Sequence, residues 1–269
     1  MLDKKNFDFT DDDKLKKNLS GIKKKFIVLS GKGGVGKTTV AVNLAYALAL
    51  KNYKVGLLDV DIHGPNIVKM LGIDDALFEG DDLTMPAFKV LENLKVMSMA
   101  FFLKSKDTPI IWRGPLKMKI IKEFLGDINW GELDYLIIDS PPGTGDEPLS
   151  VIQLITDLAG AIVVTTPQEV AILDARKSIE FVRQLGVPYI GLIENMSGLI
   201  CPHCKEVIDL FKSGTGEKIA SNLNIDFLGE IPLEPEIVSL SDKGQVFVKE
   251  GNSIAAEKFG EIVRKIEKI

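Results

Sequence analysis

A glycine-rich loop connects two apolar stretches, and its sequence is Ser30-Gly31-Lys32-Gly33-Gly34-Val35-Gly36-Lys37-Thr38-Thr39. An apolar run at residues 26–29 precedes it and an apolar stretch at residues 40–50 follows it, which predicts a strand, a loop and a helix in this order. The loop fits the pattern G-x-x-x-x-G-K-[ST], in which glycines let successive backbone N–H groups surround a phosphate and the helix N-terminus adds its positive dipole end. The sequence therefore predicts a polyphosphate-binding site.

Three side chains of this loop have expected roles. Lys37 would reach the β- and γ-phosphates as a point charge, and the Thr38 hydroxyl would complete the octahedral oxygen shell of a Mg²⁺ ion. Lys32 is not required by the general pattern, and it is either a phosphate contact or a solvent-exposed loop residue. We expect phosphate contacts from the whole loop, namely Gly31, Lys32, Gly33, Gly34, Val35, Gly36, Lys37, Thr38 and Thr39.

The composition is that of a globular protein. The chain has 269 residues, of which 45% are hydrophobic and 26% charged, and it can bury a full core. A formal net charge of −5 argues against a general affinity for nucleic acid, which needs a basic face. With two cysteines, no cleavable signal sequence and no apolar run of about 18 residues or more, we expect a cytoplasmic protein with reduced thiols and no membrane span.

The chain alternates short β-branched runs with helical stretches from residue 26 onward. Such alternation predicts a doubly wound α/β fold, with a mostly parallel sheet that helices cover on both faces. We interpret residues 1–24 as a polar, partly ordered arm and residues 25–269 as a single domain, because no Pro- or Ser-rich linker divides them. Residues 72–93 are expected to form an extended connection with little regular structure. The predicted strands are residues 26–29, 54–58, 94–100, 135–138, 161–164, 189–193 and 227–231.

Several polar residues follow these strands, at the edge where ligands bind in such folds. Asp59 and Asp61 follow the second strand, two residues apart. We expect these carboxylates either to have different functions or to cap the next turn. His63, in the same turn, receives no role. Asn195 follows the sixth strand, and its amide either pairs with the edge of an adenine or stabilises a turn.

A second acidic motif, Asp139-Ser140-Pro141-Pro142-Gly143-Thr144-Gly145-Asp146, follows the fourth strand. Asp139 ends a run of apolar residues, which is typical of an aspartate that holds Mg²⁺ directly or through water. The two prolines and the glycine form a stiff turn with one flexible joint. We expect the Gly143 amide to sense the γ-phosphate and to move after hydrolysis, unless the segment is an unrelated surface turn.

The cysteine pair in Cys201-Pro202-His203-Cys204 leaves several interpretations open. The pair could be a redox dithiol or an inert buried pair. It could also be half of a metal site, because four ligands are needed and one chain supplies only two thiolates and His203. Two chains related by a two-fold axis would supply four thiolates, which suit either zinc or a four-iron cluster.

These motifs together resemble one ATPase family. The loop with Lys32 resembles the deviant P-loop of the class that contains the nitrogenase iron protein, the arsenite-pump ATPase, MinD, ParA and Mrp/ApbC. The motifs at residues 59–66, 112–115 (Trp-Arg-Gly-Pro), 139–146 and 201–204 resemble Mrp/ApbC iron–sulfur carrier ATPases in particular, from about residue 24 to the end. Trp112 and Arg113 are either interface anchors or a core tryptophan beside a surface arginine.

The resemblance implies a homodimer that binds ATP with Mg²⁺ and hydrolyses it slowly. It assigns catalysis to Lys32, Lys37, Asp61 and Asp139, with Lys32 reaching the nucleotide of the other subunit and Asp61 positioning the attacking water. It places Asp59 beside Thr38 near the Mg²⁺ ion, and Asn195 and Pro232 around the adenine. It also implies a labile [4Fe–4S] cluster between Cys201 and Cys204 of the two chains, passed to apo iron–sulfur proteins, with zinc as the alternative occupant.

A positioning ATPase of the MinD/ParA kind, which binds membrane or DNA, is the second class considered. Residues 253–269 predict an amphipathic helix, but its polar face mixes acidic and basic residues, whereas membrane-surface helices favour a cationic excess. We therefore expect this helix to pack on the domain. Cys201 and Cys204 would also have no task in a positioning ATPase.

Overall fold

The computed structural model describes residues 10–61, 64–73, 87–102, 114–210, 214–251 and 253–269. The strands are β1 (Ile22–Leu29), β2 (Val55–Asp59), β3 (Phe88–Leu91), β4 (Leu94–Ser98), β5 (Leu133–Asp139), β6 (Gly160–Thr165), β7 (Ile190–Ile200), β8 (Val207–Ile208) and β9 (Asp226–Leu233). The helices are α1 (Thr10–Ser20), α2 (Lys37–Leu50), α3 (Ile67–Met70), α4 (Gly114–Gly126), α5 (Asp146–Leu154), α6 (Glu169–Gln184), α7 (Thr215–Asn222), α8 (Pro235–Asp242), α9 (Phe247–Glu250) and α10 (Ile254–Ile266), and a 3₁₀ turn, η1, covers Met99–Phe102.

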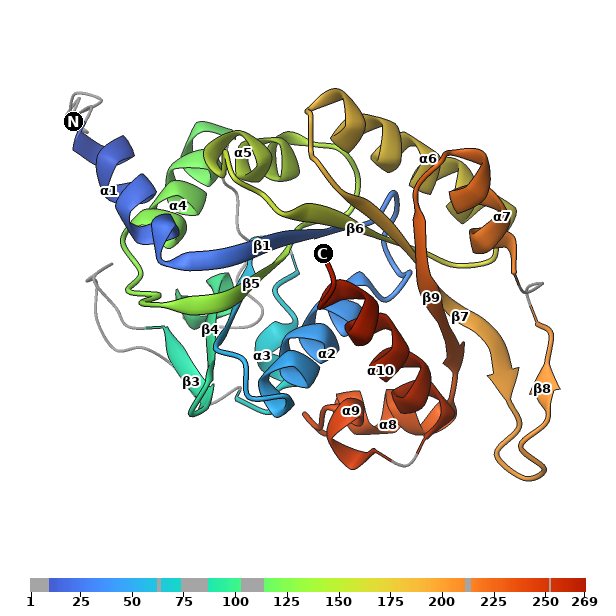
Figure 1. Ribbon diagram of the computed structural model, residues 1–269. Coiled ribbons are helices and arrows are strands. Elements are labelled where there is room, and N and C mark those ends of the chain that lie inside the picture. The colour runs from blue at the N-terminus through green and yellow to red at the C-terminus, as the bar shows by residue number, and fades with distance from the viewer. Residues whose placement is uncertain (1–9, 62–63, 74–86, 103–113, 211–213, 252) are drawn as a thin grey trace.

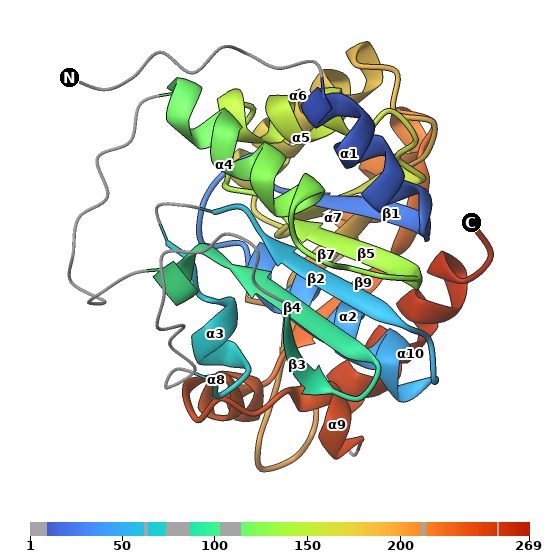
Figure 2. The ribbon, with the colours of Figure 1, turned by 90° about the vertical axis from the view of Figure 1, so that its left-hand side faces the viewer.

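The strands form one sheet in the order β3-β4-β2-β5-β1-β6-β7-β8, and β9 also pairs with β7. Strand β1 lies between β5 and β6, parallel to both, and of the described strands only β3 and β8 run antiparallel to their neighbours. Helices α1, α4, α5 and α6 cover one face, and α2, α3, α8, α9 and α10 cover the other (Figure 1, Figure 2). The predicted doubly wound, mostly parallel α/β fold is confirmed.

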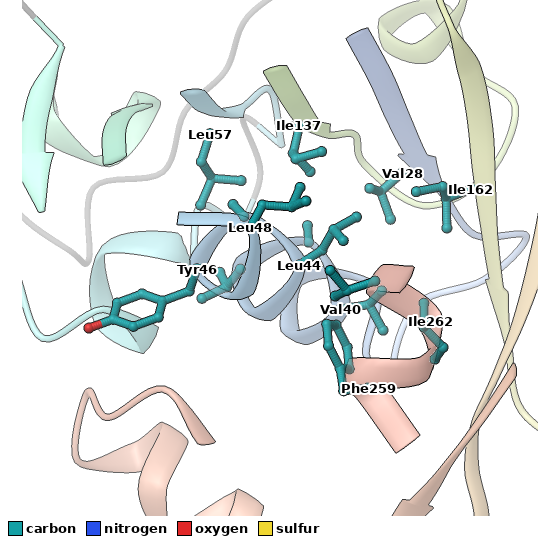
Figure 3. Packing of buried hydrophobic residues seen from close by; sticks show 14 of the residues in the cluster. Val28, Val40, Leu44, Tyr46, Leu48, Leu57, Ile137, Ile162, Phe259 and Ile262 are labelled. Atoms are coloured by element: carbon teal, nitrogen blue, oxygen red, sulfur yellow. The ribbon is translucent and has the colours of Figure 1, made fainter. Parts of the chain in front are cut away.

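Helix α2 forms the centre of the core on its face of the sheet. Its residues Val40, Leu44 and Leu48 recur every four positions, so they share one side of the helix; Leu44 and Leu48 lie toward the strands, and Val40 lies beside Phe259 and Ile262 of α10 (Figure 3). Side chains of α10 pack against the same helix, which explains why α2 is apolar over most of its circumference. This arrangement fixes the N-terminal end of α2, and the loop before it, against the central strand.

The C-terminal helix packs on the domain, as predicted. Phe259, Ile262 and Ile266 of α10 are fully buried, and the Ser253 hydroxyl caps the helix by accepting a hydrogen bond from the Ala256 N–H at 3.0 Å. Within the described ranges, no helix has both the length and the apolar content required to cross a membrane.

The predicted polar arm at residues 1–24 needs correction over its described part. Residues 10–20 form α1, and β1 begins at Ile22. Leu15 and Leu19, one helical turn apart, are buried against the other helices of this face, and the Asn18 side chain donates to the Leu125 and Ile128 carbonyls at 2.7 Å. Two apolar residues in a charged helix are therefore enough to attach this segment to α4.

The strand boundaries also differ from the predicted ones. The connection predicted at residues 72–93 contains β3, which pairs with β4 at the edge of the sheet. Strand β7 extends to Ile200 instead of ending at 193, so Asn195 lies within the strand. Its pairing with β9 is irregular between Asn195 and Leu199, where Met196 and Gly198 have positive φ values of 58° and 75°.

Candidate functional site

The glycine-rich loop joins the C-terminal end of β1 to the first turn of α2. Gly36 precedes the helix with φ 82°, in the left-handed region, and a Cβ atom there would lie 2.2 Å from Asn195 Nδ2. A Cβ atom on Gly31 would lie 2.2 Å from the backbone of Asp174. The loop therefore needs glycine at both positions, because neighbouring elements approach its backbone closely.

The phosphate cavity is a hollow of about 410 Å³ beside this loop, within the size range of small-molecule sites. Most of the predicted loop residues line it, but Gly31 and Lys32 do not. Its lining also includes residues of α3 and α8 that sequence analysis did not predict. The lining residues are Ser30, Gly33, Gly34, Val35, Gly36, Lys37, Thr38, Thr39, Asp61, Asn66, Lys69, Met70, Pro142, Ser241 and Asp242.

Lys37, Thr38 and Asp139 form a connected cluster at the base of this cavity. The Lys37 ammonium donates to Asp139 Oδ1 in a buried ion pair, and the Thr38 hydroxyl donates to Asp139 Oδ2 at 2.7 Å. The structure thus brings together three predicted site residues from two distant parts of the sequence, the glycine-rich loop and the end of β5.

Asp59 lies next to this cluster because β2 and β5 pair with Asp59 opposite Asp139. Both carboxyl groups are fully buried, and Asp59 accepts hydrogen bonds from the Ser98 hydroxyl at 2.9 Å and the Asp61 N–H at 3.0 Å. Burial raises the pKa of Asp59, and the charge of Asp139 raises it further. Burial also raises the pKa of Asp139, against the lowering effect of Lys37. Hydroxyl and carboxylate oxygens of this kind fit Mg²⁺.

Asp61 lies on the other side of the turn, at the wall of the phosphate cavity. Its Oδ1 atom accepts a hydrogen bond from the Gly64 N–H at 3.2 Å. Asp59 and Asp61 therefore have different surroundings, and Asp61 also stabilises the turn. His63 lies outside the described residues, as do Trp112 and Arg113.

The turn after β5 packs against the start of the glycine-rich loop. Gly143 has φ 94°, and its N–H donates to the Ser30 carbonyl at 2.7 Å. Contact between this N–H and a γ-phosphate would require that hydrogen bond to be exchanged. Lys32 points elsewhere, because its ammonium lies 3.4 Å from Gln168 Oε1, outside the phosphate cavity.

The apolar cavity is a second hollow, of about 210 Å³, next to the phosphate cavity. Asn195 lies between the two, since its Nδ2 atom donates to the Val35 carbonyl at 2.8 Å and its side chain also reaches this cavity. Pro232 does not line it, whereas its neighbours do, because alternate residues of β9 face opposite sides. The lining residues are Gly36, Thr39, Val40, Asn195, Met196, Ile231, Leu233, Ile237, Val238, Ser241, Asp242, Phe247 and Phe259.

The cysteine hairpin, residues 199–208, extends from the end of β7, and in Figure 1 it projects from the body of the domain at the lower right. Both cysteines are free thiols; Cys201 is half-buried and Cys204 exposed. Backbone hydrogen bonds from Cys204 and His203 lower the pKa of Cys201, which favours the thiolate needed for metal binding. The described part of the chain contains no group of three or more His, Cys, Asp or Glu residues arranged to hold a metal ion.

Four polar residues of the phosphate cavity, Asn66, Lys69, Ser241 and Asp242, were not predicted from the sequence. Asn66 lies within a motif that was quoted for its aspartates. The three other residues belong to short helices without glycine-rich or acidic motifs, so no local pattern marked them.

Comparison with known proteins gives consistent matches. The family model described as "ParA: NUBPL iron-transfer P-loop NTPase" matches residues 21–267. The "Iron-sulfur cluster carrier protein" of Methanocaldococcus jannaschii is 51% identical over 95% of this chain and 88% of its own length. The "Cytosolic Fe-S cluster assembly factor Nubp2 homolog" of Anopheles gambiae is 44% identical over 92% of this chain and 98% of its own.

Among solved structures, a nucleotide-binding protein from Archaeoglobus fulgidus in complex with ADP is 38% identical, with a TM-score of 0.79 over 92% of this chain and 96% of its own. The cell division protein MinD of Aquifex aeolicus is 23% identical, with a TM-score of 0.66 over 91% of this chain and 98% of its own. The likeness to MinD concerns the fold alone.

Proposed function

The chain belongs to the NUBPL iron-transfer P-loop NTPase family, and from this premise we propose that it is an ATP-hydrolysing iron–sulfur cluster carrier. One observation carries the proposal: strand β7 supplies Asn195 to the nucleotide site and continues directly into the cysteine hairpin. A positioning ATPase would leave this hairpin without a task, and its C-terminal helix would not need to be buried. We expect the protein to act in the cytoplasm, like the relative named a cytosolic factor.

The nucleotide site would act on Mg²⁺-bound ATP. In this proposal Lys37 exchanges Asp139 for the β- and γ-phosphates, while Thr38, Asp139 and Asp59 provide oxygen donors for the Mg²⁺ ion. Asp61, at the cavity wall, orients the attacking water. The Gly143 N–H leaves the Ser30 carbonyl to bind the γ-phosphate and returns after hydrolysis.

A homodimer would complete both centres. Lys32 lies outside the phosphate cavity of its own chain, which supports a contact with the nucleotide of the other subunit. Each chain provides two thiolates, so two hairpins facing each other across a two-fold axis provide four. Four thiolates fit a [4Fe–4S] cluster or zinc, and the carrier role requires the cluster.

The cluster would be cargo, held for transfer to apo iron–sulfur proteins. Residues 202–210 are exposed throughout, so an acceptor protein can approach the thiolates without unfolding of the domain. The test is to load the protein with iron and sulfide under anaerobic conditions, remove free iron, and add an apo acceptor enzyme that needs a [4Fe–4S] cluster. Recovery of acceptor activity with loss of the donor cluster supports the role. A cluster that stays on the donor, or stoichiometric zinc that iron does not replace, contradicts it.

A further inference from the structure

The phosphate cavity and the apolar cavity adjoin each other. They share four residues, Gly36 and Thr39 at the start of α2 and Ser241 and Asp242 at the end of α8. The phosphate cavity presents the glycine-rich loop and Lys37, whereas the apolar cavity presents aliphatic and aromatic side chains suited to a base. In any nucleotide the ribose links the base to the phosphates. The sugar therefore has to lie where the two cavities meet.

Ser241 and Asp242 are the last two residues of α8, and they are the polar residues that this helix contributes to both cavities. A carboxylate accepts two hydrogen bonds, and two adjacent sugar hydroxyls can donate both of them. An acidic side chain that binds ribose hydroxyls is a known solution in dinucleotide-binding folds. The Ser241 hydroxyl can accept or donate a further hydrogen bond.

The position of Asp242 is unfavourable for the helix that carries it. A carboxylate at a helix C-terminus lies at the negative end of the helix dipole, and the last turn of α8 contains no basic residue. Within the described ranges, the Asp242 carboxylate makes no ion pair and no hydrogen bond. The exposed carboxylate thus has no stabilising task in the fold, which leaves it available to a ligand.

A close backbone contact holds this end of α8 in place. Gly72, just after α3, and Gly244, two residues after Asp242, both have positive φ values, of 65° and 69°. A Cβ atom on Gly244 would lie 2.4 Å from the Gly72 Cα atom, so the two segments touch through their backbones. Because α3 also lines the phosphate cavity, the wall that carries Asp242 is fixed relative to the phosphate site before any ligand binds.

We propose that Asp242, assisted by Ser241, binds the 2′- and 3′-hydroxyls of the ribose and makes the protein selective for ribonucleotides over deoxyribonucleotides. The inference rests on the proposed nucleotide site and adds a residue that determines its specificity.

Equilibrium binding of ATP, 2′-deoxy-ATP, 3′-deoxy-ATP and inorganic tripolyphosphate to the full chain tests the proposal. We expect the wild type to bind ATP about tenfold or more tightly than either deoxy nucleotide, because each lacks one hydrogen bond to a charged acceptor. Asp242→Asn should reduce this preference to about threefold or less while tripolyphosphate binding persists. Ser241→Ala should reduce the preference less, because a neutral hydroxyl contributes less than a carboxylate.

Glu236→Gln provides the matched control, because it removes one charge from an exposed position of the same helix, outside both cavities. It should keep the full preference for ATP. Equal binding of ATP and both deoxy nucleotides by the wild type would overturn the ribose assignment and leave the nucleotide site standing. An equal loss of preference in Glu236→Gln would also overturn it, since general electrostatics would then be the cause. If the wild type binds neither ATP nor tripolyphosphate, the nucleotide site itself is wrong, and the inference fails with it.

Discussion

Lys37 and Asp139 form an ion pair in which their side chains are only 6% and 1% exposed. Asp59 lies opposite Asp139 on the neighbouring strand, so the positive charge of Lys37 acts on two buried carboxyl groups. If Lys37 turns to a phosphate group, Asp139 loses its ion-pair partner in a region of low dielectric constant and keeps the hydrogen bond from the Thr38 hydroxyl. We therefore expect nucleotide binding to need another cation beside the two aspartates.

ATP should accordingly bind much more weakly without Mg²⁺. We expect removal of Mg²⁺ with EDTA to weaken ATP binding by about tenfold or more, because the carboxylates would lack a counter-charge. Calorimetry at fixed ionic strength measures this difference. An ATP affinity that does not depend on Mg²⁺ would show that the aspartates do not need the ion.

Lys37→Ala and Asp61→Ala should have different effects. Lys37→Ala should abolish ATP binding, whereas Asp61→Ala should keep the dissociation constant within about threefold and lower kcat by about 100-fold or more, because only the second removes an interaction specific to the reacting water. Lys54→Ala, at an exposed lysine far from the cavity, is the control. Unchanged turnover in Asp61→Ala would remove the assignment of this residue to catalysis.

Lys32 should act on the nucleotide of the other subunit. A heterodimer of Lys32→Ala and Asp61→Ala chains would contain one site with Asp61 from its own chain and an intact Lys32 from the partner. We therefore expect mixing of two inactive variants to restore part of the ATP turnover. Absence of activity in heterodimers isolated with two different affinity tags would place Lys32 within its own subunit.

Asp134 should make the stability of the domain dependent on pH. Its carboxylate accepts hydrogen bonds from the Lys23 ammonium and the Lys54 N–H, both at 2.8 Å, and the Lys23 contact is the main cause of its lowered pKa. A lowered pKa in the folded state contributes stability above the unfolded value of 3.8, and this contribution is lost as the pH falls through the folded pKa.

Asp134→Asn should therefore lower the thermal midpoint at pH 7 by about 1–3 °C, the effect of about 0.5–1 kcal/mol in a chain of this size. The difference from the wild type should disappear at low pH, while Asp13→Asn, at an exposed position of α1, changes little at any pH. Thermal unfolding followed by circular dichroism across pH measures both. A difference that stays constant with pH would contradict the assigned role.

The central strands and the glycine-rich loop were predictable from the sequence because local patterns mark them. Apolar β-branched runs mark β1, β5 and β6, and Gly31, Gly36 and Lys37 lie within one short motif. Asp59 and Asp139 were both predicted as site residues, since each ends an apolar run. Their position side by side follows from the order of strands in the sheet.

Features that depend on tertiary contacts were not predictable in the same way. Strand β7 continues past Asn195, where a turn was an open alternative, because pairing with β9 up to Asn195 and with β8 and β9 from Leu199 onward flanks the irregular segment on both sides. Ser241 and Asp242 line the phosphate cavity and the apolar cavity at the end of α8, which backbone contact between Gly72 and Gly244 helps to position. Neither arrangement has a local sequence signal.

Iron and sulfide content of the anaerobically reconstituted protein tests the central claim most directly. The wild type should bind about two irons and two sulfides per chain, half of a four-iron cluster held by four thiolates. Cys201→Ser or Cys204→Ser should remove iron binding while ATP binding persists, and His203→Ala, which changes the same hairpin without removing a thiolate, should keep the cluster. A full cluster in either cysteine variant, or an iron-loaded protein that is monomeric in solution, would contradict the account.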